Sequence, residues 1–142
     1  MNHKVEIEQY LTACKCNEEV KAIVLKIDNY MSNPGKIFEF GFANSKNPPP
    51  RNIYYAIFSK KRNNKSFHLV SLVPHKNSIR IKIKIGIHII EEKMPDLIET
   101  LEIKDVSYQY KDVPSIEFHL HSQSQLNYFY TLLDFVYKYY VD

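Results

Sequence analysis

The 142-residue sequence has no tryptophan, three glycines and two cysteines. So few glycines equip it poorly for a phosphate-cradling loop, and it contains neither a nucleophile elbow nor a dinucleotide-binding fingerprint. A disulfide between Cys14 and Cys16 would close almost no loop, and no second cysteine pair completes a zinc site. We therefore expect two plain thiols and no cofactor.

Long hydrophobic runs are also missing. No stretch approaches the ~18 to 20 apolar residues of a membrane span, and residues 1–10 lack the apolar core of a signal peptide. We expect a cytoplasmic protein with no membrane partner. The length suits one domain over residues 1–142, because a chain of this size can bury a substantial core.

Acidic residues are absent over a long central segment. None occurs between Glu39 and Glu91, whereas ten of the 19 lysines and arginines lie there. After Ile90 the balance reverses, with ten acids and four cations. Such segregation predicts an electric field with two poles, and its basic pole favours an anionic partner.

The order of elements predicts an α+β fold. Asn17 is a good N-cap for a helix over residues 18–31, and Ser122 with Gln125 forms a capping box that opens a last helix. We expect strands over residues 36–43, 51–60, 66–73, 78–89, 103–110 and 115–121, and a short irregular helix over 91–101. The predicted fold is an antiparallel meander of about five to six strands with the N-terminal and C-terminal helices on one face.

The stretch SIRIKIKIGIHI, residues 78–89, alternates isoleucine with polar residues. Its cations would lie ~7 Å apart on one face of a strand, close to the ~6 to 7 Å between phosphates of a nucleic acid. Aromatic residues on adjoining strands could stack on bases. Exposed lysines can also block aggregation of strands or simply be solvated, so the alternative that this face binds no ligand stays open. The predicted nucleic-acid-binding residues are Lys60, Lys61, Arg62, Lys65, Arg80, Lys82 and Lys84.

The last helix has a second apolar stripe, and a helix apolar on two sides packs against two surfaces. The second surface is either the first long helix or another copy of the chain. The residues of the predicted interface are Tyr128, Leu132, Phe135 and Tyr139. The alternative function is therefore a protein-interaction or regulatory module that forms a homodimer and binds no nucleic acid.

Two patterns imitate catalytic or metal sites. The dipeptide PD at 95–96 and the tripeptide EIK at 102–104 look like the acidic elements of nucleases. The PD dipeptide, however, falls in a predicted helix. The side chains of Glu117, His119 and His121 share one face of a strand, and one strand cannot wrap three ligands around a metal. We expect no catalytic or metal residues. An enzyme of another type stays open and would need a deep pocket joining distant polar residues.

Three pieces of the chain resemble a known family: VEIEQYLTACKCNEEVKAIVLKIDNYM, KSFHLVSLVPHKNSIRIKIKI and IEFHLHSQSQLNYFYTLLDFVYKYY. The family is a small bacterial domain of unknown function, described as a predicted transport protein and often fused to restriction-type endonuclease domains. The first piece is also similar to the start of a small α+β family of iron chaperones. The resemblance implies a helix–sheet–helix fold and an accessory role near nucleic acid, in restriction or phage defence, with a nuclease as partner. It implies no site residues, and ANSKNPPPRN has no counterpart in either pattern.

Overall fold

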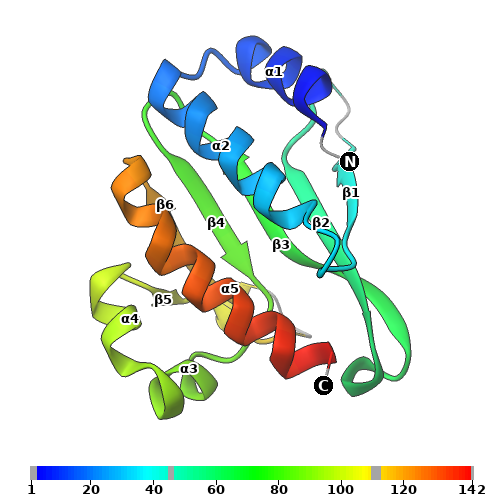
Figure 1. Ribbon diagram of the computed structural model, residues 1–142, viewed down its shortest axis with the longest axis vertical. Helices are drawn as coiled ribbons and strands as arrows, with labels where there is room; N and C mark the ends of the chain where they lie inside the picture. Colours follow the sequence, from blue (N-terminus) through cyan, green and yellow to red (C-terminus); the bar gives the residue numbers. More distant parts are fainter. Residues whose placement is uncertain (1–2, 45–46, 110–112, 142) are drawn as a thin grey trace.

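A computed structural model describes residues 3–44, 47–109 and 113–141, and it has a six-stranded sheet with helices (Figure 1). The strand order is β1-β2-β3-β4-β6-β5, and all neighbours are antiparallel. The strands are β1 Glu39–Phe42, β2 Ile53–Ser59, β3 Lys65–Pro74, β4 Ile79–Ile83, β5 Lys104–Asp105 and β6 Ile116–Leu120. The helices are α1 Lys4–Ala13, α2 Glu18–Met31, α3 Ile87–Lys93, α4 Pro95–Thr100 and α5 Leu126–Val141. Short 3-10 turns are η1 Lys60–Arg62, η2 Ser107–Gln109 and η3 Gln123–Gln125. The predicted α+β class is confirmed.

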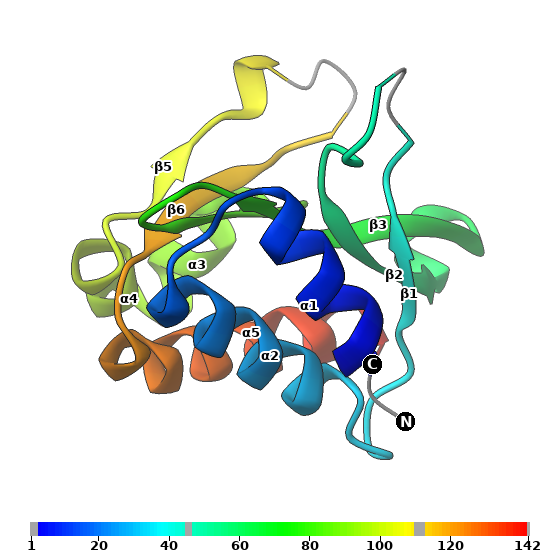
Figure 2. The ribbon, with the colours of Figure 1, turned by 90° about the horizontal axis from the view of Figure 1, so that it is seen from above.

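The molecule has two main layers. Helices α2 and α5 lie side by side across one face of the sheet (Figures 1 and 2). The described parts of the β1–β2 and β5–β6 connections extend from the opposite side (Figure 2). We call the side of the sheet away from α2 and α5 the outer face. Strands β4 and β6 bury alternate side chains under the helices and turn the others outward.

Strand β4 follows this alternation closely. The side chains of Ile79, Ile81 and Ile83 are completely buried, whereas Arg80 and Lys82 between them are partly exposed. The isoleucine half of the pattern thus forms core, as predicted. The predicted N-cap of α2 is confirmed, and the predicted capping box is present but opens η3, which leads directly into α5 at Leu126. The Asn17 side chain accepts a hydrogen bond from the backbone of Val20, and Ser122 forms a capping box with Gln125.

The strand predicted over residues 78–89 is wrong in length. Strand β4 ends at Ile83, the Lys84 N–H makes one further bond to the Leu69 carbonyl, and Gly86 becomes the N-cap of α3. Ile85 and Ile90 are nevertheless buried. The isoleucine spacing after Ile83 serves a turn and a short helix, because a short apolar run satisfies more than one period.

Two further elements differ from the prediction. The single irregular helix expected over residues 91–101 is part of two helices, because Pro95 starts a new one at its first position. The strand expected over residues 103–110 shrinks to the two residues of β5, followed by η2; residue 110 lies outside the described residues. The edge of β6 beyond residue 117 has no strand partner among the described residues on that side.

The predicted β2–β3 turn is confirmed. Asn63 and Asn64 both have positive φ, at 58° and 57°, which asparagine tolerates well. The turn contacts the end of α5, because the Ser59 hydroxyl donates a hydrogen bond of 2.8 Å to the Tyr140 carbonyl. The hairpin tip therefore lies beside the C-terminal helix.

The second stripe of α5 is only partly exposed. Leu132 is completely buried, so we remove it from the predicted interface. Tyr128 is 48% exposed, and Phe135 and Tyr139 are half-buried. Part of this side of α5 is covered by the chain itself, since α4 contacts α5.

Candidate nucleic-acid interface

The outer face carries a row of cations along β4. Arg80 is paired across the sheet with Val73 of β3 and His119 of β6. Lys82 is paired with Ser71 and Glu117 in the same way, and Lys84 follows two residues later. Paired residues turn their side chains to the same face. Strands β2, β3 and β4 contain no acidic residue, so with the cations of β4 these three strands give their part of the face a positive potential.

The acid closest to the row is Glu117. Its Oε1 atom lies 3.6 Å from Arg80 Nη1 but accepts no hydrogen bond, and the Glu117 side chain is 16% exposed. An ion pair without a hydrogen bond is weak, typically ~0 to 1 kcal/mol near a surface. Glu117 therefore neutralises part of the charge of Arg80 without locking its position.

The row continues past the end of β4 with Lys84. Burial, and then the positive charge of Arg62, lower the pKa of the Lys84 ammonium below its ordinary value. Burial, and then the charge of Lys84, lower the pKa of His68. Lys84 therefore lies near enough to His68 of β3 to influence its pKa, and Arg62 of η1 influences that of Lys84 in turn.

The other hairpin cations lie beyond that end. Lys61 Nζ is 5.0 Å from the centre of the Tyr139 ring, on the α5 side of the tip, and the Arg62 guanidinium is 4.8 Å from the Phe67 ring. Lys60 and Lys65 are exposed at the hairpin. The structure thus places Arg80, Lys82 and Lys84 in one row, whereas Lys61 and Arg62 lie against Tyr139 and the core ring of Phe67, on the α5 side of the hairpin.

Aromatic rings lie beside this row. The Tyr54 and His68 rings are stacked, with centroids 3.6 Å apart and planes 6° apart, and Phe58 is 63% exposed. Gly41 makes room for Tyr54, since a Cβ there would collide with its ring. Strand alternation turns Tyr54 and Phe58 outward, but Tyr55 and Phe67 are core residues.

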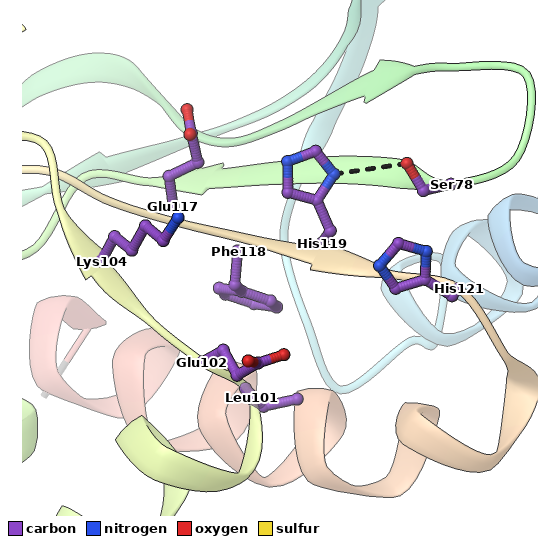
Figure 3. Close-up of a pocket in the computed structure, with 8 residues that line it drawn as sticks. All are labelled: Ser78, Leu101, Glu102, Lys104, Glu117, Phe118, His119 and His121. Carbon is purple, nitrogen blue, oxygen red and sulfur yellow. Dashed lines mark hydrogen bonds between the residues drawn. The ribbon is translucent and has the colours of Figure 1, made fainter.

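A pocket of about 390 Å³ lies along the open edge of β6, at the other end of the outer face (Figure 3). Figure 3 shows Glu117 and His119 on one side of β6 and Phe118 on the other, toward the helices. The lining residues are Ser78, Leu101, Glu102, Lys104, Glu117, Phe118, His119 and His121. The EIK element of the nuclease-like pattern reaches this pocket through its outer two residues, whereas Asp96 does not line it.

Histidines give the pocket its chemistry. The Ser78 hydroxyl lies 3.3 Å from His119 Nδ1, and the rings of His75 and His121 lie 5.8 and 6.1 Å from the His119 ring. Burial, followed by the nearby His75, lowers the pKa of His119. Within the described ranges, no group of three or more His, Cys, Asp or Glu residues is placed to hold a metal ion. The pocket therefore offers imidazole and hydroxyl groups for hydrogen bonding, beside the charged side chains of Glu102, Lys104 and Glu117.

Sequence reasoning missed the contribution of Ser78 and His75 to this cluster. Both precede β4, and the antiparallel pairing Ile79↔Leu120 brings them to the end of β6. Alternation alone placed His119 on the outer face, but the β4–β6 neighbourhood was needed to find its partners. A prediction that β4 pairs with β6 would have indicated that Ser78 and His75 lie near His119.

Searches against protein-family models, curated proteins and solved structures gave no match for this chain. The resemblance to the small bacterial family therefore stays a prediction. Over the residues that the structure describes, no helix combines the length and the apolar character needed to cross a membrane.

Proposed function

We propose that the outer face binds single-stranded nucleic acid without catalysing a reaction. The observation that carries the proposal is the row of Arg80, Lys82 and Lys84 on a face where strands β2, β3 and β4 have no acid. A strand laid along β4 would place phosphates beside these cations, at the ~7 Å spacing of alternate strand residues. Such contacts hold the backbone and read no sequence.

The exposed aromatic rings favour a single strand over a duplex. In a duplex the bases are stacked on one another, so Phe58 and the Tyr54–His68 pair would meet only backbone. In a single strand the bases can turn toward the protein, and each base stacked on an aromatic ring contributes ~1 to 3 kcal/mol. We therefore assign the cations to the backbone and Phe58 to a base.

A place in restriction or phage defence, beside a nuclease partner, belongs to the same proposal and rests on the family resemblance alone. The charge pattern supports an accessory binding domain. It does not distinguish DNA from RNA, because phosphate contacts and stacking serve both.

The experiment is a binding titration monitored by fluorescence anisotropy. Labelled single-stranded DNA, single-stranded RNA and duplex DNA of equal length are each titrated with protein over a series of salt concentrations. We expect single strands to bind more tightly than the duplex, with log K falling linearly with log salt as counterions are released. Absence of binding to every probe at low salt would overturn the proposal.

A further inference from the structure

An apolar groove of about 390 Å³ lies on the helix side of the molecule, between α3, α5 and the η1 turn. Its lining residues are Lys61, Ile89, Glu92, Lys93, Phe135, Lys138 and Tyr139. The groove lies on the helix side of the sheet, and none of Arg80, Lys82 and Lys84 lines it. It contains Phe135 and Tyr139 of the second stripe of α5 but not Tyr128.

The floor and the rim of the groove differ in chemistry. Ile89, Phe135 and Tyr139 supply apolar surface, and each is half-buried. The rim has three ammonium groups and one carboxylate. Lys61 Nζ lies 5.0 Å above the Tyr139 ring, so at least one cation sits over the apolar floor. Long lysine stems can cover apolar surface while their charged ends stay in water.

We propose that this groove binds a small anionic amphiphile, an alkyl or aryl carboxylate. Its hydrocarbon part would lie on Ile89, Phe135 and Tyr139, and its carboxylate would stay at the rim beside Lys93 and Lys138. The charge excess selects an anion, and the apolar floor selects a ligand with a tail. A free acetate would lack the second contribution, and an alkylammonium would be repelled.

The size of the groove favours a small ligand over a helix of another protein. Small-molecule pockets span ~300 to 1,000 Å³, so 390 Å³ lies at the lower end of that range. A helix with its side chains is ~10 to 12 Å across and needs a longer groove for successive turns. A second copy of the chain is the competing occupant.

The first measurement compares three probes by NMR chemical-shift titration of the full chain, below the concentrations at which the probes form micelles. The probes are decanoate, decyltrimethylammonium and acetate. We expect decanoate to bind with shifts centred on α3 and α5, and the other two to bind at least roughly tenfold more weakly. Equal affinity for decanoate and decyltrimethylammonium would overturn the proposal.

The second measurement uses paired variants. Tyr139→Ser should weaken decanoate roughly tenfold by removing an aromatic ring from the floor, whereas Tyr128→Ser, on the same helix outside the groove, should not. Lys93→Glu combined with Lys138→Glu changes only exposed charges and should weaken binding similarly, unlike Lys26→Glu. Unchanged affinity in the charge-reversed protein would contradict the proposal even if Tyr139→Ser failed to fold.

Sedimentation equilibrium separates the competing occupant. We expect a monomer with and without decanoate. A dimer that dissociates in the charge-reversed protein or in Tyr139→Ser would show that a second copy fills the groove, and it would overturn the small-ligand proposal. Neither result bears on the outer face, so this proposal can fail while the nucleic-acid interface stands.

Discussion

Glu117 of β6 lies 3.6 Å from Arg80 of β4, and it is the acid that the sheet pairs with the cation row. A phosphate approaching Arg80 would meet this carboxylate as well. Glu117→Gln keeps the shape of the side chain and removes its charge. We expect it to tighten single-strand binding roughly two- to fivefold at low salt, the size of a weak ion pair.

The check on this prediction is the same anisotropy titration, with Glu102→Gln as the control. Glu102 lines the pocket but is exposed and has no partner in the β4 register. If both substitutions tightened binding equally, the effect would be one of net charge, and the location of the site on β4 would lose its support.

The exposed ring of Phe58 should contribute to binding but little to stability. Because it is 63% exposed, we expect Phe58→Ala to change the free energy of unfolding by less than about 0.5 kcal/mol. Loss of one stacked base should weaken single-strand binding by about 1 to 3 kcal/mol and leave duplex binding unchanged. Tyr128→Ala on α5 is the control; an equal loss there would argue against base stacking on the outer face.

Tyr55 stabilises a buried carboxylate. Its hydroxyl donates a 2.7 Å hydrogen bond to Asp28, which is 1% exposed and also accepts a bond from the His3 backbone. Tyr55→Phe removes one donor from the buried carboxylate, which keeps only its contacts with His3, and should lower the free energy of unfolding by about 1.5 to 3 kcal/mol. Urea denaturation measures this loss. Tyr54→Phe, one residue away on the outer face, should cost much less, and equal losses would refute a special role for Asp28.

His119 in the pocket should make the folded protein less stable in acid. Burial lowers the pKa of His119 in the folded protein below 6.5, whereas the unfolded chain takes up its proton near that value. The unfolded state therefore binds more protons as the pH falls through 6.5, and stability falls with it; above that range the contribution is constant. His119→Gln should flatten this decline in thermal unfolding. If melting temperature changed with pH in the same way in His119→Gln, the wild type and the exposed control His88→Gln, a contribution of His119 to the acid loss of stability would be ruled out.

The fold was predictable from the sequence where a local pattern is compatible with only one local structure. Asn63 and Asn64 specified the hairpin, and the caps at Asn17 and Ser122 specified two helices. Residues 84–89 had two solutions. The same isoleucines suit a strand edge or a turn that leads into α3, and only packing against the rest of the core decides between them.

The site was predictable only in part, because its second half is built by long-range pairing. Alternation correctly turned Arg80 and Lys82 away from the buried isoleucines. It could not place Lys61 on the α5 side of the hairpin, nor bring His75 beside His119. Those contacts depend on how the hairpin bends and on which strand becomes the neighbour of β4.

The central claim is that Arg80, Lys82 and Lys84 contact phosphates. Its most direct test replaces all three with serine and compares the salt dependence of single-strand binding with that of a matched protein carrying Lys4→Ser, Lys26→Ser and Lys93→Ser. Both variants lower the net charge by three. We predict that the slope of log K against log salt falls by about 2 in the β4 variant, at about 0.7 per lost phosphate contact, and stays near the wild-type value in the control. Equal slopes in the two variants would contradict the claim.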